Sequence, residues 1–162
     1  MRVVVVGGVA GGMSAAARLR RRDEEADIIV VERGPYVSFA NCGLPYYVGG
    51  EIADPARLLL HTPQSLKAAL NLDVRINSEA SAINPAAHAV RITNTKTGEA
   101  YTLSYDRLIL TPGAFAARPP IDGLDSARVH TLRTVDDALA LRETPGTRAL
   151  VLGAGFIGIE AA

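Results

Sequence analysis

The sequence is poor in cysteine and in aromatic residues. Its 162 residues include one cysteine, no tryptophan, five tyrosines and three phenylalanines. A single thiol cannot form an intramolecular disulfide, so Cys42 is either a quiet packing residue or a reactive centre. Arg2 leads directly into four valines and then glycines, which indicates a strand and a turn and not a secretion signal. With one cysteine, this favours a reducing, cytoplasmic location.

The chain also lacks an excess of charge and a long apolar run. Seventeen basic and seventeen acidic residues cancel, so no global field attracts nucleic acid or an anionic membrane. The one dense basic run, Arg18 with Arg20–Arg22, is followed at once by the acidic residues 23–25. No apolar stretch approaches the roughly 20 residues that span a bilayer. We therefore expect neither a nucleic-acid partner nor a membrane partner.

Metal binding is not indicated either. The three histidines, His61, His88 and His130, have no spacing typical of metal ligands and no acid or cysteine partner nearby in sequence. We interpret them as surface or packing residues.

What the sequence does contain is a glycine-rich turn between a strand and a helix. Residues Val3–Val6 form a β-branched run typical of a buried parallel strand, and Gly7–Gly12 follows it. Residues 13–22 are rich in Ala, Leu and Arg and predict a helix. A second apolar run, 28–31, ends in Glu32, 20 residues beyond Gly12. This order predicts an α/β dinucleotide-binding unit in which the acid reaches a ribose hydroxyl.

The glycine turn departs from the usual fingerprint, because its middle position is Val9. A pyrophosphate at a helix N-terminus needs free N–H groups and an unobstructed approach, which glycines provide. A tight strand–helix turn without a ligand is the alternative, and the spacing of Glu32 favours the nucleotide site.

The predicted helix carries a polar face. Ser14, Arg18 and Arg21 are separated by four and three residues, so they lie on one side of the helix. A hydroxyl and two guanidinium groups suit a phosphate-bearing ligand. A solvated face balanced by residues 23–25 explains the pattern equally well.

Cys42 lies in the stretch Ser38-Phe39-Ala40-Asn41-Cys42-Gly43-Leu44-Pro45-Tyr46-Tyr47. Glu32 marks the carboxyl edge of its strand, the side where ligands of such folds bind, and ten residues lead from it to the cysteine. We expect the thiol to return to the ligand side of the sheet. If Asn41-Cys42 opens a short helix, we hypothesise that the helix dipole and a bound cofactor favour the thiolate.

The middle of the chain alternates short elements with turns. Thr62-Pro63 predicts a helix start, and Leu66 and Leu70 are its apolar side. Four strand-like segments, 73–76, 80–83, 89–93 and 100–103, predict a small antiparallel meander. Another buried strand, 108–110, ends in the tight turn Thr111-Pro112-Gly113.

A second glycine motif closes the chain. The apolar run 149–152 predicts a strand, and Gly153-Ala154-Gly155-Phe156-Ile157-Gly158 is a full G-x-G-x-x-G followed by Glu160. A dinucleotide-binding unit needs some thirty residues, so we expect this chain to be an N-terminal piece of a longer protein. The predicted organisation is a nucleotide-binding domain over 1–115, a connecting segment over 116–147 and the start of a second nucleotide-binding domain over 148–162.

Taken together, Val6–Ser14 and Ser38–Tyr46 resemble flavin-dependent pyridine nucleotide-disulfide oxidoreductases. Within that family the chain is most similar to the single-cysteine branch of coenzyme A-disulfide reductases, NADH oxidases and NADH peroxidases. Its motifs are closest to the coenzyme A-disulfide reductases, including those with a C-terminal rhodanese domain that reduce persulfides or polysulfides. The resemblance implies a Rossmann-like FAD-binding domain, with a parallel sheet and a small antiparallel meander, and an NAD(P)H-binding domain that begins near residue 148.

The resemblance also implies site residues. Cys42 matches the redox cysteine beside the flavin. The implied FAD contacts are Gly7, Gly8, Val9, Ala10, Gly11, Gly12, Glu32, Arg33, Ala80, Thr111, Pro112, Gly113 and Arg133, and the implied NAD(P)H contacts are Gly153, Gly155 and Gly158. The implied coenzyme A contacts are Ser14, Arg18, Arg21, Ser38 and Asn41.

Two departures discriminate within the family. Double-cysteine reductases have a second cysteine five residues after the first, where this chain has Tyr47, and peroxidases and oxidases tend to have a histidine where it has Ala10. The resemblance therefore implies NAD(P)H-dependent reduction of coenzyme A disulfide, coenzyme A persulfide or polysulfide through Cys42, in a homodimer. The alternatives are an NADH oxidase or peroxidase with a cysteine-sulfenic acid, and a non-catalytic nucleotide-binding module.

Overall fold

The computed structural model describes residues 1–146 and 148–162 of the chain. These residues form two compact units, the first made of residues 1–39 and 60–113 and the second of 40–59 and 114–162. Residue 147, the predicted end of the connecting segment, lies outside the described residues, and the predicted domain boundaries remain predictions.

The first unit is built on a four-stranded parallel sheet. Its strand order is β3 (Asp73–Arg75), β2 (Asp27–Val31), β1 (Arg2–Val6) and β7 (Arg107–Leu110). In register, Val3 pairs with Ile28 on one side and with Arg107 on the other. The predicted parallel α/β fold is confirmed, because every pairing of β1, β2, β3 and β7 is parallel.

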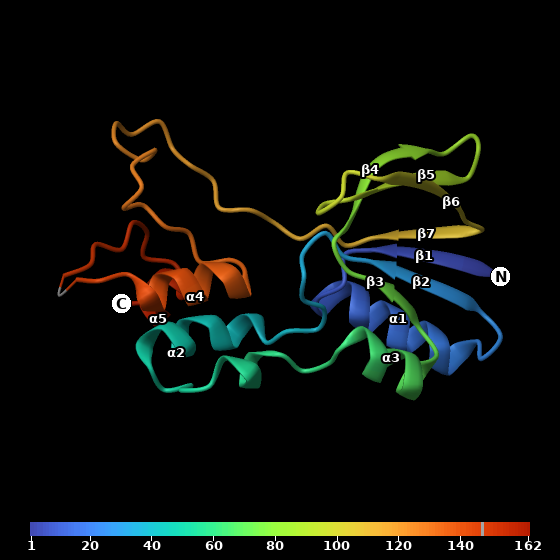
Figure 1. Ribbon diagram of the computed structural model, residues 1–162, viewed down its shortest axis with the longest axis horizontal. Coiled ribbons are helices and arrows are strands. Elements are labelled where there is room, and N and C mark those ends of the chain that lie inside the picture. The colour runs from blue at the N-terminus through green and yellow to red at the C-terminus, as the bar shows by residue number, and fades with distance from the viewer. Residues whose placement is uncertain (147) are drawn as a thin grey trace. The chain divides into compact units, whose positions relative to one another are not determined.

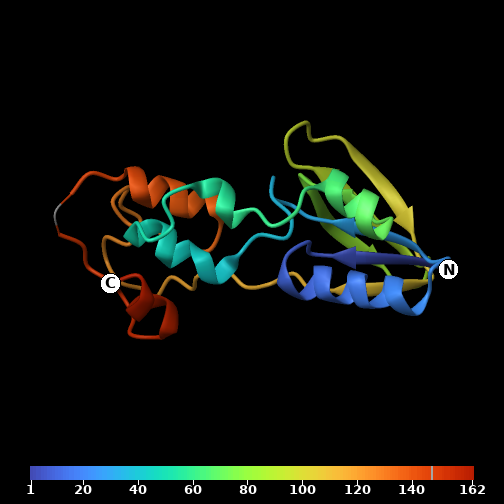
Figure 2. The same cartoon turned by 90° about the horizontal axis from the view of Figure 1, so that it is seen from below.

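Helices cover one face of this sheet and a small second sheet covers the other. Helix α1 (Ala10–Arg22) and helix α3 (Pro63–Leu70) pack through Met13 and Leu66 against Val3 and Val5 (Figures 1 and 2). On the opposite face, Val4 packs among residues of the second sheet. Since side chains of a strand alternate between faces, a continuous valine run supplies both cores.

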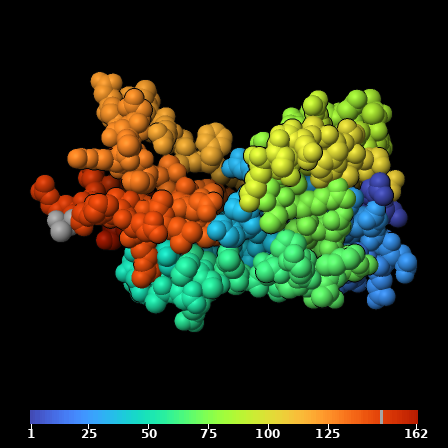
Figure 3. Space-filling view, in the orientation of Figure 1, coloured from blue at the N-terminus to red at the C-terminus, as the bar shows by residue number. Residues whose placement is uncertain are grey.

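The second sheet is an antiparallel meander of β4 (Ser78–Asn84), β5 (Ala89–Asn94) and β6 (Ala100–Ser104). Its atoms form one continuous lobe in the space-filling view (Figure 3). The prediction that 73–76 is also part of the meander was wrong, because β3 pairs in parallel with β2. The physical reason is that 73–75 follows α3, so β2, α3 and β3 form a crossover unit and β3 completes the parallel sheet.

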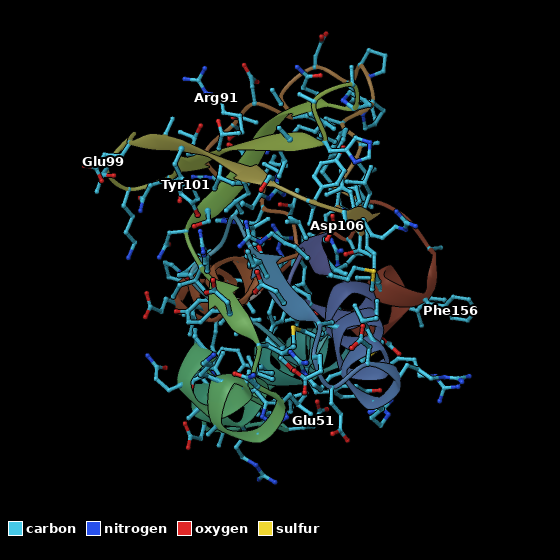
Figure 4. All side chains as sticks on the ribbon, turned by 90° about the vertical axis from the view of Figure 1, so that its right-hand side faces the viewer. Glu51, Arg91, Glu99, Tyr101, Asp106 and Phe156 are labelled. Atoms are coloured by element: carbon cyan, nitrogen blue, oxygen red, sulfur yellow. The ribbon has the colours of Figure 1, made fainter. Side chains whose placement is uncertain are left out.

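Arg75 at the end of β3 links the two sheets. Its side chain donates hydrogen bonds of 3.1 and 2.7 Å to Asp73, and its guanidinium lies 5.4 Å from the ring centroid of Tyr101 on β6. Tyr101 is labelled in Figure 4, on the same sheet as Arg91. The hydrogen bond with Asp73 is the main effect that raises the pKa of Arg75 further above its ordinary value, so this guanidinium is a permanent cation.

The described residues of the second unit form helices and loops. They comprise the 3₁₀ helix η1 (Asn41–Gly43), α2 (Leu44–Gly49), the 3₁₀ helix η2 (Pro55–Leu58), α4 (Val135–Glu143) and α5 (Phe156–Glu160). The strand predicted over 149–152 is not formed: no strand runs through these residues, and Leu150 is 92% exposed. A strand needs a neighbour that accepts its backbone hydrogen bonds, and the described part of this unit contains none. Phe156 accordingly points away from the ribbon (Figure 4).

Candidate functional site

The first glycine turn is closed so tightly that it excludes side chains at two positions. Gly7 has φ +99°, and a Cβ there would lie 2.0 Å from the carbonyl oxygen of Thr111. A Cβ on Gly12 would lie 1.8 Å from the carbonyl oxygen of Gly7. Both positions therefore require glycine, as the sequence pattern predicts.

The middle position of the turn does not require glycine. Val9 is the N-cap of α1 with φ −109°, outside the left-handed region that favours glycine, so the backbone here does not call for a glycine. Among the described residues no side chain caps the helix, and its first turn contains no acidic residue. The first N–H of the helix with a backbone partner is that of Met13, which donates to the carbonyl oxygen of Val9 at 3.0 Å. The N–H groups of residues 10–12, which precede it in the helix, and the helix dipole are thus available to an anion.

Glu32 is oriented beside this turn. One of its carboxylate oxygens accepts a 2.7 Å hydrogen bond from the Gly8 amide, and the other accepts a 2.9 Å hydrogen bond from the Gly34 amide. Glu32 directly follows β2 and is half-buried. The carboxylate is fixed at the carboxyl edge of the parallel sheet, with lone pairs left to accept hydrogen bonds from hydroxyl groups.

Thr111 supports the turn from the end of β7. Its Oγ1 donates to the carbonyl oxygens of Val6 at 2.7 Å and of Gly7 at 3.2 Å, and its backbone N–H donates to Val6 at 2.8 Å. A Cβ on Gly11 would meet only its methyl group, at 3.3 Å. Thr111 therefore braces the glycine turn from the end of β7, the strand that pairs with β1.

The predicted polar face of α1 is present and unengaged. Ser14, Arg18 and Arg21 are exposed, and none of these three side chains forms a hydrogen bond or an ion pair within the described residues. Arg20, by contrast, donates to five carbonyl oxygens, those of Leu70, Asp23, Glu24, Ala26 and Asn71. The acidic segment 23–25 accepts hydrogen bonds from Arg20 through its backbone carbonyl oxygens. Arg18 and Arg21 are thus free to contact a ligand.

Cys42 lies in the second unit, within η1, and its side chain is exposed. The short helix considered at Asn41-Cys42 is present, since η1 begins at Asn41 and runs directly into α2. The neighbouring Asn41 has its Oδ1 buried without a hydrogen-bond partner among the described residues. An unsatisfied buried acceptor is uncommon in proteins and points to a donor supplied from elsewhere.

Ser38 belongs to the first unit, and its backbone is tied to the glycine turn. It has φ +50°, and its N–H donates a 2.9 Å hydrogen bond to the carbonyl oxygen of Gly8. The structure therefore holds Ser38 within reach of the turn, whereas Asn41 and Cys42 fall in the other unit.

The remaining predicted flavin contacts are dispersed. Arg33 is exposed, and its carbonyl accepts a 3.2 Å hydrogen bond from Thr95. Ala80 is half-buried in β4, against the core shared by the two sheets. Arg133 lies in the second unit, where its Nε donates to Ala114 at 2.9 Å. Their roles remain predictions.

The second glycine motif is closed in the same way as the first. Gly153 has φ +118°, and a Cβ on Gly158 would lie 2.1 Å from the carbonyl oxygen of Gly153. Gly155 is the N-cap of α5, again without a side-chain cap in the described part of the chain. The turn is therefore shaped like the Gly7–Gly12 turn.

Sequence reasoning missed three contacts. The hydrogen bond from the Gly34 amide to Glu32 joins residues two apart, and the turn-forming pair Gly34-Pro35 is the one sequence feature beside it. Arg20 resembled its arginine neighbours, and only its position opposite the end of α3 distinguishes it. Arg142 carried no signal, because its partners are backbone carbonyls far along the chain.

The described residues contain no group of three or more His, Cys, Asp or Glu side chains arranged to hold a metal ion. Nor does any helix within them combine the length and apolarity needed to cross a bilayer.

A glycine turn pinned between two parallel strands, uncapped helix amides and a positioned acid define a dinucleotide-binding Rossmann-like unit. The chain belongs to the pyridine nucleotide-disulphide oxidoreductase family, whose model matches residues 1–162.

Comparison with individual proteins narrows the relationship. The chain is 39% identical to a coenzyme A disulfide reductase of Staphylococcus aureus, an alignment that covers 98% of this chain and 36% of the relative. It is similar in structure to the reduced CoADR-RHD of Bacillus anthracis, with TM-score 0.95, 48% identity and coverage of 99% of this chain and 30% of that one.

Two further solved structures are also similar. A NAD-dependent persulfide reductase from A. fulgidus matches with TM-score 0.91 and 40% identity, over 100% of this chain and 31% of that one. A water-forming NADH oxidase from Lactobacillus brevis, bound to NADH, matches with TM-score 0.92 and 35% identity, over 99% and 36% of the two chains. The chain thus spans about a third of the length of each of these relatives.

Proposed function

We propose that this chain forms the FAD-binding part of an oxidoreductase that uses NAD(P)H to reduce coenzyme A disulfide or a related persulfide or polysulfide. The observation that carries the proposal is the exposed thiol of Cys42, the one cysteine of the chain, on η1. The similarity to a coenzyme A disulfide reductase and to a persulfide reductase supports this substrate class. The expected cytoplasmic location and homodimer are part of the same proposal.

The residues of the first glycine turn fit FAD. Its pyrophosphate would rest on the uncapped amides of α1. A Cβ at Gly12 would displace the turn and so disturb this binding site. The Glu32 carboxylate, fixed by two amides, would accept the ribose hydroxyls. When bound, FAD supplies two-electron transfer from NAD(P)H. The Gly153–Gly158 turn is the proposed NAD(P)H contact.

Cys42 would act as the nucleophile on sulfur. Its thiolate attacks one sulfur of the disulfide, so that a Cys42–substrate disulfide forms and one thiolate leaves, which then takes a proton from solvent. Two electrons and a proton derived from NAD(P)H, with one further proton, then cleave this bond and return the cysteine and the second thiol. Since Tyr47 stands five residues later, no second cysteine of this chain intercepts the intermediate.

The phosphorylated part of the substrate would bind to the helix face of Ser14, Arg18 and Arg21. Both guanidinium groups are exposed and free of protein partners within the described residues, so binding a phosphate breaks no internal contact. Ser38 and Asn41 are the proposed contacts that lie closer to Cys42 in the sequence, and the unsatisfied Oδ1 of Asn41 is suited to accept a hydrogen bond from the ligand.

A water-forming NADH oxidase or a peroxidase is the second candidate. The similarity to the Lactobacillus brevis oxidase favours it, since that protein shares the fold over nearly the whole chain. In that case Cys42 would cycle through a sulfenic acid. Ala10 counts against it, because a methyl group cannot serve as the base that peroxide chemistry needs.

The test is the substitution Cys42→Ser in the full-length protein. We expect FAD to remain bound and NAD(P)H-dependent reduction of coenzyme A disulfide to fall by at least about a thousandfold, because a hydroxyl does not form the mixed disulfide. Full activity of this variant would refute the proposal. Oxygen- or peroxide-dependent NADH consumption without reduction of coenzyme A disulfide would identify the oxidase or peroxidase, and a colourless protein without bound flavin would identify a non-catalytic module.

A further inference from the structure

Arg142 makes an unusual set of contacts for an exposed arginine. It lies near the end of α4, and its Nη1 donates hydrogen bonds to the carbonyl oxygens of Tyr47 at 2.6 Å and of Ile52 at 2.8 Å. Its guanidinium carbon also lies 4.5 Å from the ring centroid of Tyr47, which is 7% exposed. One side chain thus binds the last turn of α2 and the loop that follows it.

These contacts fasten the helical segment that begins with Cys42. The thiol is in η1 (Asn41–Gly43), and η1 continues without a break into α2 (Leu44–Gly49). The segment is only nine residues long, too short to be stable on its own. Its ends must be held by other parts of the chain if the thiol is to keep one position.

The N-terminal end of the segment is held by backbone and packing. Ala40 donates a 2.8 Å hydrogen bond to Leu58, and a Cβ on Gly43 would lie 2.9 Å from the Leu58 side chain. At the C-terminal end, Gly50 and Arg142 donate to Tyr47. Within the described residues, Arg142 supplies the only side-chain hydrogen bond to α2. The exposed orphan carbonyls of a helix end are where such a cation binds best.

Helix α4, which carries Arg142, is itself well anchored. A capping box between Thr134 and Asp137 starts the helix, and Val135 and Ala138 are buried. Arg133, directly before it, donates to Asp137 and to Ala114. Helices α2 and α4 lie side by side in both the ribbon and the space-filling view (Figures 1 and 3). The guanidinium therefore connects the cysteine segment to a helix with a fixed start.

We propose that Arg142 is a positioning residue that holds the Cys42-bearing helical segment against α4 and so sets the position of the reactive thiol. The proposal has two parts. The effect of Arg142 on substrate reduction rests on the proposed function. Its mechanical effect, which is to hold the segment 41–49 in place, does not. Arg142 acts on the thiol indirectly, through Tyr47 and the backbone of α2.

The mechanical part is tested by amide hydrogen exchange on the full-length protein. In Arg142→Met, the rate of amide exchange over residues 41–52 should rise about tenfold, because one or two charge-assisted hydrogen bonds are lost. Exchange over the meander, residues 78–104, should not change. Arg57→Met is the matched control, since Arg57 is exposed in the same unit and its side chain has no partner within the described residues. Equal exchange in the Arg142→Met and Arg57→Met variants, or a uniform increase across the protein, would overturn the proposal.

The functional part is tested by separating the two half-reactions. Flavin reduction by NAD(P)H should proceed at the wild-type rate in Arg142→Met, while reoxidation by the disulfide substrate slows about tenfold. Arg142→Lys keeps a cation with several donors but loses the flat stacking on Tyr47, so it should recover part of both effects; if the methionine variant does not fold, the lysine variant is compared with Arg57→Lys. An equal loss in both half-reactions would show a merely structural role. A wild-type protein that does not reduce disulfides would refute the proposed function and leave the exchange result to decide the role of Arg142.

Discussion

The backbone amide of Gly8 donates a 2.7 Å hydrogen bond to the carboxylate of Glu32, 24 residues away. This bond joins the glycine turn to the end of β2, so the two parts of the nucleotide site are fixed to each other before any ligand binds. The second carboxylate oxygen is held by the Gly34 amide.

Replacing Glu32 by Gln should weaken FAD binding about tenfold to a hundredfold. A glutamine side chain offers one acceptor where two amides now donate, so one N–H would face an NH₂ group and lose about 1–3 kcal/mol. The measurement is the dissociation constant of FAD for the reconstituted apoprotein. Glu79→Gln, at an exposed position of β4, is the control; equal FAD affinities of the two variants would contradict the role of Glu32.

The glycine turn predicts opposite outcomes for two adjacent substitutions. Gly12→Ala should abolish FAD binding or folding, because its Cβ would lie 1.8 Å from the carbonyl of Gly7. Gly11→Ala should be tolerated within about 1 kcal/mol, since its Cβ would approach only a methyl group and alanine favours helix. Flavin content and the thermal midpoint of each purified variant distinguish these outcomes. A yellow, stable Gly12→Ala protein would show that the turn relaxes more easily than its geometry indicates.

Arg20 should contribute far more stability than its neighbour Arg22. Arg20→Met leaves five carbonyl oxygens without their donor and should lower the free energy of unfolding by about 2–3 kcal/mol. Arg22 is exposed and has no side-chain partner within the described residues, so Arg22→Met should change it by no more than about 0.5 kcal/mol. Urea unfolding of the two variants provides the comparison, and similar midpoints would refute it.

The free arginines of α1 should affect substrate binding and not folding. Replacing Arg18 and Arg21 together by Met should raise KM for coenzyme A disulfide about tenfold or more at low salt, with little change in kcat. The difference should shrink as ionic strength rises, because exposed charges are screened. Steady-state kinetics at two salt concentrations test this, with Arg22→Met as the control. A lower kcat at constant KM would place these arginines in another role.

The first nucleotide site was largely predictable because its parts are close in sequence and chemically distinctive. The order of the valine run, the glycines, the helix and Glu32 follows from local patterns, and the structure confirms each element. The assignment of 73–76 failed for the reason that pairing partners are not visible in a short strand. A three-residue strand after a helix fits either sheet until its long-range contacts are known.

The second unit was harder to predict. The contacts of Arg142 with Tyr47 and Ile52 span 95 and 90 residues and involve backbone carbonyls, which carry no residue-specific signal. The run 149–152 has a strand composition, yet composition alone does not form a strand without a neighbour. In this unit, contacts between residues far apart in the sequence determine the structure more than the local preferences of the residues do.

The likeness of the two glycine turns bears on the order in which the chain folds. Gly153 and Gly158 reproduce the closure of Gly7 on Gly12, although the described residues 148–152 before them form no strand. The contact that shapes each turn joins residues five apart, so closing it costs little chain entropy and is fast compared with the pairing of distant strands. Closing such a turn is therefore a local step, whereas bracing the first turn from Thr111 joins residues 104 and 105 apart in the sequence.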